Sequence, residues 1–122
     1  VAAQFGLSTP SVFKQLDAGR ASGLYPASGE LVEPAELLSV LSSYDGSEAA
    51  LASLAPLLRN DLQAPALSCA PQLEQTLNLR DSEGVYASLV SGSGPTVLLL
   101  TSSQARAEAL ASALRDTLSA RF

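Results

Sequence analysis

Two short β-prone runs lie in the last third of this 122-residue chain, on either side of a glycine-rich triplet. Residues 85–91 read VYASLVS, residues 95–101 read PTVLLLT, and Gly92-Ser93-Gly94 lies between them. Such runs predict two strands joined by a tight glycine loop. Most of the remaining chain has helical spacing, so its sheet must be small. The pattern favours an α+β domain in which helices cover one small antiparallel or mixed sheet.

Apolar residues at three- and four-residue spacing predict several helices. We expect them over residues 10–17, 34–44, 47–54 with an interruption at Pro56, and from residue 103 onward. Two shorter helical segments are expected after Asn60-Asp61, which is typical of a helix cap, and after Pro71. The apolar opening, Val1 to Phe5, predicts a strand. Residues 18–33 hold three glycines and a proline and predict an irregular loop.

The overall charge argues against a nucleic-acid partner. Seven basic and twelve acidic residues give a formal net charge of -5, which is unlike the basic footprint of a phosphate-backbone binder. No apolar run approaches the roughly 18 to 20 residues that span a bilayer, so we expect no membrane partner and a cytoplasmic location. The absence of histidine excludes histidine-dependent triads and ordinary zinc–histidine sites, and we expect no metal ligands in this chain.

Two further features concern cysteine and methionine. Cys69 is the single cysteine and has no internal disulfide partner, which is typical of a reducing compartment. We expect it to be a partly buried, inert thiol. The sequence contains no methionine, and therefore no initiator, so we expect it to be part of a longer protein.

The Gly92-Ser93-Gly94 loop is a candidate anion site. Glycines permit positive φ angles and let a ligand approach backbone N–H groups without interference from Cβ atoms. The alternative is a glycine hairpin that binds nothing. The segment lacks the Gly-Lys-Ser/Thr of a phosphate-binding P-loop, the third glycine of a dinucleotide fingerprint and the flanking glycines of a hydrolase elbow.

A second candidate site begins at Gly6-Leu7-Ser8-Thr9-Pro10. A capped helix start presents free N–H groups to an anion, and the Thr9 hydroxyl adds a further donor. Phe13 lies one turn later, where its ring would stack on a planar ligand. The alternative is an ordinary capped helix whose Phe13 belongs to the core. We interpret Asn60-Asp61-Leu62-Gln63 as a cap that satisfies backbone donors.

Three blocks in this order carry a resemblance to a known family. GLSTPxxF at residues 6–13, NDLQAPAL at 60–67 and LVSGSGPT at 89–96 resemble the C-terminal half of the 4-diphosphocytidyl-2-C-methyl-D-erythritol kinases, which belong to the GHMP kinase superfamily. The resemblance covers essentially the whole chain. It implies that residues 1–122 form a ferredoxin-like C-terminal, substrate-side domain with a small, mostly antiparallel sheet. It also implies a final strand after Phe122.

The resemblance further implies a function. The full-length protein would use ATP and Mg²⁺ to phosphorylate the 2-hydroxyl of 4-diphosphocytidyl-2-C-methyl-D-erythritol in the non-mevalonate isoprenoid pathway. Thr9 would contact the substrate, and Phe13 would help to sandwich its cytosine ring. The substrate and phosphate region would be lined by Gly92, Ser93 and Gly94. The role implied for Asn60 and Asp61 is structural.

In that family the ATP phosphate loop, the lysine and the catalytic aspartate lie in the N-terminal half, which this sequence lacks. We therefore expect no catalytic residue here, no ATP or Mg²⁺ bound by this chain alone, and no activity without its own N-terminal domain as partner. Two alternatives remain open. The chain could come from another GHMP small-molecule kinase, such as a homoserine or mevalonate kinase, or be a non-catalytic α+β module that binds ligands or forms oligomers.

Overall fold

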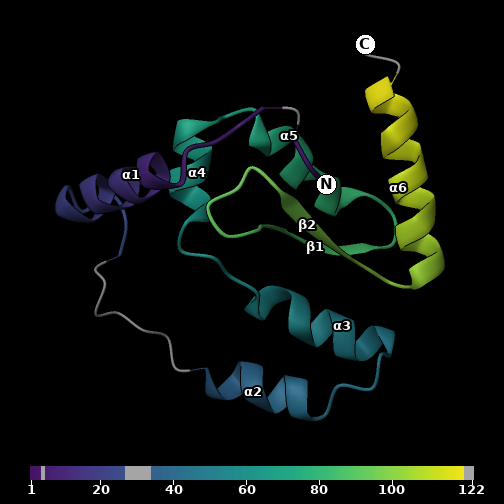
Figure 1. Cartoon of the computed structure of the whole chain (residues 1–122). Coiled ribbons are helices and arrows are strands. Elements are labelled where there is room, and N and C mark those ends of the chain that lie inside the picture. The colour runs from purple at the N-terminus through teal and green to yellow at the C-terminus, as the bar shows by residue number, and fades with distance from the viewer. Residues whose placement is uncertain (4, 27–33, 120–122) are drawn as a thin grey trace.

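The computed structural model describes residues 1–3, 5–26 and 34–119, with an antiparallel β-hairpin at the centre of its helices (Figure 1). The hairpin consists of β1 (Val85–Val90) and β2 (Val97–Thr101). Val90 pairs with Val97 and Leu89 with Leu98, and the register shifts between Val85 and Ala87. The predicted pair of strands and the α+β class are therefore confirmed.

Six α-helices and two short 3₁₀ helices surround the hairpin in the described residues. In chain order they are α1 (Thr9–Ala21), α2 (Ala35–Ser42), α3 (Glu48–Leu54), η1 (Ala55–Leu57), α4 (Gln63–Cys69), α5 (Leu73–Leu77), η2 (Asn78–Asp81) and α6 (Gln104–Ser119). Helix α1 packs beside α4, and α5 contacts both strands. Helices α2 and α3 lie on the lower side in Figure 1, and α6 stands beside β2.

Local sequence explains where two of these helices begin. The Ser8 hydroxyl accepts a hydrogen bond from the Ser11 amide at 3.4 Å, and Pro10 occupies the first turn of α1. The Ser47 hydroxyl accepts from the Ala50 amide at 3.1 Å and caps α3. Helix α3 gives way to η1 at Pro56, which lacks an amide donor, as the sequence predicts.

The core lies where α1, α4 and α5 meet the end of the hairpin that carries the glycine loop. Its buried side chains are apolar, and they are Val12, Ala66, Ala70, Leu73, Leu77, Val90 and Val97. Phe5, Leu7, Leu62, Leu67 and Leu99 pack against them and are partly buried. Because Val90 and Val97 flank residues 91–96, the loop starts and ends on the most buried part of the domain.

The predicted strand over Val1 to Phe5 is wrong for the residues that the structure describes there. Val1 alone pairs with β2: its terminal ammonium group donates to the Val97 carbonyl at 2.6 Å, and the Val97 amide donates to the Val1 carbonyl at 3.0 Å. Phe5 packs inward against the core instead of continuing this pairing. Residue 4 lies outside the described residues.

Two other predictions need correction. Helix α1 continues to Ala21, so the irregular segment begins later than residue 18; Gly19 lies within the helix, and the Tyr25 ring packs closely over it. Residues 27–33 of that predicted loop lie outside the described part of the chain. Cys69 is exposed, not partly buried, because the core is reached by its helix neighbours Ala66 and Ala70.

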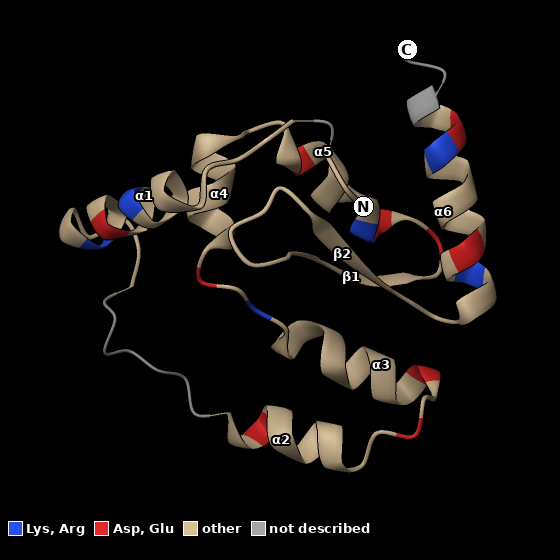
Figure 2. Cartoon of the chain, in the orientation of Figure 1, with Lys and Arg blue, Asp and Glu red and all other residues tan. Residues whose placement is uncertain are grey.

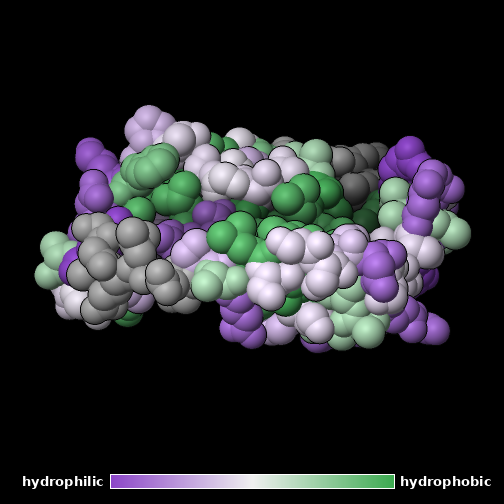
Figure 3. Space-filling view, turned by 90° about the horizontal axis from the view of Figure 1, so that it is seen from below, coloured by the Kyte–Doolittle hydropathy of each residue, from purple (hydrophilic) through white to green (hydrophobic). Residues whose placement is uncertain are grey.

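Charged and apolar side chains occupy different parts of the surface. Neither strand carries a charged residue, and the Lys, Arg, Asp and Glu side chains of the described residues lie on helices and connecting segments (Figure 2). Seen from below, hydrophobic side chains gather in a hollow between more polar rims (Figure 3). Large apolar side chains that remain exposed include Leu38, Leu41 and Leu98. Among the described residues, no helix has the length and apolar character needed to cross a bilayer.

Candidate functional site

The fold brings the first and third sequence blocks into contact. The Thr9 and Ser93 hydroxyl oxygens lie 2.8 Å apart and share a hydrogen bond, although the residues are 84 positions apart in sequence. Thr9 is the first residue of α1, and Ser93 lies in the loop between β1 and β2. The start of a helix and the tip of a hairpin thus form one polar surface.

Phe13 lies one helical turn after Thr9 and on the same side of α1. Its side chain is 48% exposed, whereas the neighbouring Val12 is fully buried. The core-phenylalanine alternative is therefore wrong: Val12 and Leu16 fill the core position of this helix instead. The exposed ring offers an apolar face for stacking beside the hydroxyl pair.

The backbone of the loop depends on its two glycines. Gly92 and Gly94 have φ angles of +58° and +77°, which side-chain-bearing residues rarely adopt. The Ser91 amide donates to the Thr96 carbonyl at 2.8 Å, and the Gly94 amide donates to the Ser91 carbonyl at 2.9 Å. A Cβ atom on Gly94 would lie 3.1 Å from a methyl group of Val90. The loop is thus tightly turned against the core.

Two neighbouring amides at the tip of this loop remain available. Among the hydrogen bonds of the described residues, the N–H groups of Gly92 and Ser93 donate to no acceptor. Together with the Thr9 and Ser93 hydroxyls, they form a compact set of neutral donors. Such a set suits oxygen-rich ligands, phosphates included.

Asn60 holds the loop from the other side, a contact that the sequence did not predict. Its side-chain Nδ2 donates to the Val90 carbonyl at 2.8 Å and to the Gly92 carbonyl at 2.7 Å. Its Oδ1 accepts from the Leu62 amide at 3.1 Å. The prediction of a cap is confirmed in part: Asn60 satisfies one backbone donor before α4, but α4 begins only at Gln63 and its N-cap residue, Leu62, forms no side-chain cap. One feature of the sequence could have indicated this contact: the Asn60 block and the glycine block both belong to the family resemblance.

The rest of this block divides between two tasks. Gln63 Oε1 accepts a hydrogen bond from the Val90 amide at 3.0 Å, so a second side-chain amide reaches the same strand end. Asp61 instead lies at the surface, 3.2 Å from Arg59 and 3.8 Å from Arg20. The two amides face the loop, whereas the carboxylate belongs to an exposed ion-pair cluster.

The assembled groups offer hydrogen-bond donors, acceptors and an apolar ring, which suit the binding and orientation of a ligand. The five residues predicted from sequence contribute hydroxyls, backbone amides and one aromatic ring, and none carries a charge. Across residues 1–3, 5–26 and 34–119, no three acidic or cysteine side chains gather in a way that would hold a metal ion. No nucleophile lies beside a base among these five residues.

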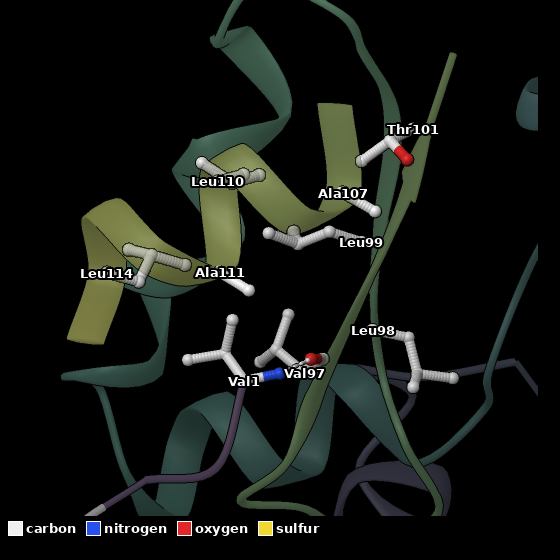
Figure 4. A pocket seen from close by; sticks show the side chains of 9 residues that line it. All are labelled: Val1, Val97, Leu98, Leu99, Thr101, Ala107, Leu110, Ala111 and Leu114. Atoms are coloured by element: carbon white, nitrogen blue, oxygen red, sulfur yellow. Dashed lines mark hydrogen bonds between the residues drawn. The ribbon is translucent and has the colours of Figure 1, made fainter. Parts of the chain in front are cut away.

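A separate cavity of about 260 Å³ lies between β2 and α6 (Figure 4). Val1, Val97 and Leu99 line one side, and α6 contributes Leu110 and Leu114 among its apolar side chains. Thr101 supplies the one side-chain hydroxyl of this lining. None of the residues predicted to bind a ligand belongs to it. The cavity therefore lacks the donors that distinguish the Thr9–Ser93 surface.

Comparison with known proteins gives a consistent result. The family described as GHMP kinases C terminal matches residues 35–120. A 4-diphosphocytidyl-2-C-methyl-D-erythritol kinase of Nocardia farcinica (strain IFM 10152) is 46% identical over 112 residues, which are 92% of this chain and 34% of that protein. Proteins of the same name from Corynebacterium jeikeium (strain K411) and Rhodococcus jostii (strain RHA1) are 43% and 47% identical over 89% and 80% of the chain.

The matches cover most of this chain but a minor part of each relative. The shares of the Corynebacterium and Rhodococcus proteins are 30% and 29%. The chain thus spans roughly a third of the length of the curated relatives that it matches.

Proposed function

We propose, since the chain belongs to the family of GHMP kinase C-terminal domains, that it forms the substrate-side part of a kinase for 4-diphosphocytidyl-2-C-methyl-D-erythritol. The full-length protein would transfer the γ-phosphate of ATP to the 2-hydroxyl of this substrate, a step of non-mevalonate isoprenoid synthesis in the cytoplasm. The names of the relatives support this substrate. The observation that carries the proposal is the Thr9–Ser93 hydrogen bond, which joins two of the recognised sequence blocks in one surface.

Each residue of the site contacts the part of the substrate that its chemistry suits. The half-exposed Phe13 ring stacks on the cytosine, whose flat π-face suits an aromatic partner. The Thr9 hydroxyl, one helical turn before Phe13, and the Ser93 hydroxyl bonded to it hydrogen-bond to polar groups of the substrate. The free amides of Gly92 and Ser93 face the phosphate region, where neutral donors stabilise negative charge.

Phosphoryl transfer depends mainly on positioning and electrostatic stabilisation, and this surface supplies the positioning of the acceptor. The described residues of this chain do not supply the lysine and acidic side chains that would hold ATP with Mg²⁺. Lys14 is the single lysine, and the described part of the chain gathers no acidic cluster for a cation. We propose that the ATP site lies in an N-terminal domain of the full-length protein, since this chain spans only about a third of the length of its relatives. The present chain alone is expected to show no kinase activity.

Replacing Phe13 tests the proposal in the full-length protein. F13A removes the stacking surface and should weaken substrate binding by about 1 to 3 kcal/mol, the usual value of a base–aromatic stack. The Michaelis constant for the cytidine substrate should therefore rise, while that for ATP stays constant. Steady-state kinetics with each substrate varied in turn provides the measurement.

Tyr44→Ala serves as the matched control, because Tyr44 is an aromatic residue of similar exposure, 43%, outside the proposed site. Equal Michaelis constants for the cytidine substrate in F13A and the wild type would contradict the stacking role. If the full-length protein instead phosphorylates homoserine or mevalonate, the family assignment stands and the substrate is wrong. Absence of any phosphoryl transfer would favour a non-catalytic module.

A further inference from the structure

We infer that Asn60 and Gln63 are positioning residues that fix the glycine loop in its substrate-binding conformation, an inference that rests on the proposed function. They lie just before and at the start of α4, and their side chains reach the end of β1. Neither needs to touch the substrate. Their effect on catalysis would pass through the backbone of residues 90–92.

Asn60 forms hydrogen bonds to the backbone on either side of Ser91. One side-chain nitrogen donates to the carbonyls of both Val90 and Gly92, at 2.8 and 2.7 Å. This double contact fixes the orientation of both peptide groups as the chain leaves the strand. It also restrains Gly92, whose φ angle of +58° would otherwise be one of many that glycine adopts.

Gln63 forms a second side-chain hydrogen bond to the backbone of Val90. Its Oε1 accepts from the Val90 amide, so side chains of the 60–63 segment satisfy both the N–H and the C=O of this residue. Val90 is 1% exposed, and buried backbone groups that lose their partners carry a large penalty. The two amide side chains therefore replace a neighbouring strand at this edge of β1.

The orientation of Ser93 follows from this arrangement. With Val90 and Gly92 fixed, the next residue brings its hydroxyl within 2.8 Å of Thr9 and leaves its own amide and that of Gly92 free. Loss of the hydrogen bonds from Asn60 and Gln63 would let the loop sample other conformations. Substrate would then have to order the loop on binding, and productive alignment of the acceptor hydroxyl would become rarer.

Asn60→Asp provides a nearly isosteric test in the full-length protein. The carboxylate keeps the acceptor for the Leu62 amide, loses both N–H donors and places negative charge beside two carbonyl oxygens. We expect kcat/KM for the cytidine substrate to fall at least about tenfold, with the Michaelis constant for ATP unchanged. Asn78→Asp, at an exposed position after α5, makes the same chemical change and should keep wild-type kinetics.

Gln63 gives an independent pair of variants in case N60D does not fold. Gln63→Glu keeps an oxygen acceptor for the Val90 amide, whereas Gln63→Leu removes it at similar size. Q63E should therefore lose less kcat/KM than Q63L. Amide NMR signals of Gly92 and Ser93 report the loop conformation without activity, and they should shift in N60D and Q63L but not in N78D.

The possible outcomes separate the two proposals. A wild-type protein that does not phosphorylate the cytidine substrate overturns the proposed function, while the amide signals still test the hydrogen bonds from Asn60 and Gln63 to the loop. An active wild type with a folded N60D of unchanged kcat/KM and unchanged Gly92 and Ser93 signals overturns the positioning role of Asn60. Equal losses in Q63E and Q63L overturn the acceptor role of Gln63.

Discussion

At the scale of single residues, the candidate site uses neutral groups throughout. The hydroxyls of Thr9 and Ser93 bond to each other, and the amide of Asn60 supports the loop beneath them. A hydroxyl pair of this kind can exchange its internal bond for bonds to a ligand, because each hydroxyl can donate and accept. The site is therefore suited to recognise hydroxyl and phosphate oxygens without a fixed charge.

A different residue, Asp45, provides a prediction about pH. Hydrogen bonds from the hydroxyl and the amide of Ser47 hold the pKa of the Asp45 carboxyl below its ordinary value of 3.8. A lowered pKa means that Asp45 stabilises the turn before α3 when the pH is above its unfolded value. That contribution is lost as the pH falls through the lower, folded-state pKa.

Carboxyl carbon NMR should accordingly show Asp45 titrating below the aspartates of the unfolded protein. In Ser47→Ala, which removes one of the donors, the Asp45 midpoint should move upward. A midpoint that does not differ between the wild type and S47A would contradict the proposed cause.

At the scale of the elements, the end of α1 is held by an aromatic contact. A Cβ atom on Gly19 would clash with the Tyr25 ring, whose hydroxyl also bonds to Ser68 at 3.0 Å. Gly19→Ala would gain up to about 1 kcal/mol of helix propensity but would displace this ring. We expect the loss to exceed the gain, so that urea unfolding shows G19A to be less stable than the wild type.

A double-mutant cycle identifies the cause of that loss. Once Tyr25→Ala has removed the ring, the added methyl group meets open space and only the helix propensity remains. G19A should then raise the stability of the Y25A protein. If G19A changes stability equally in both backgrounds, the ring contact does not limit this position.

Elements that depend on local signals were predictable from sequence, and contacts between distant blocks were not. Helix α3 follows its Ser47 cap, and the hairpin follows its glycines and β-prone runs. The strand predicted over Val1 to Phe5 is not formed. A short apolar segment can pack against a core, as Phe5 does, just as it can pair at a sheet edge. The Asn60 contact to the glycine loop was not predicted because the local sequence is the same whether the Asn60 side chain caps a nearby turn or bonds to a distant loop.

At the scale of the whole molecule, the packing of the core and the shape of the candidate site are linked. Core residues from α1, α4, α5 and the hairpin meet directly behind the glycine loop, so the packing of the domain determines the geometry of the site. The 260 Å³ cavity beside α6 lies apart from these residues. In the proposed function, this domain would supply a shaped surface for the acceptor, and the N-terminal domain would supply ATP.

Phosphorus NMR of the reaction mixture tests this division most directly. The full-length protein and the isolated 122-residue chain are each incubated with ATP, Mg²⁺ and 4-diphosphocytidyl-2-C-methyl-D-erythritol. We predict a new phosphomonoester signal on the substrate with the full-length protein and none with the isolated chain. Formation of that product by the isolated chain, or its absence with the folded full-length protein, would contradict the account.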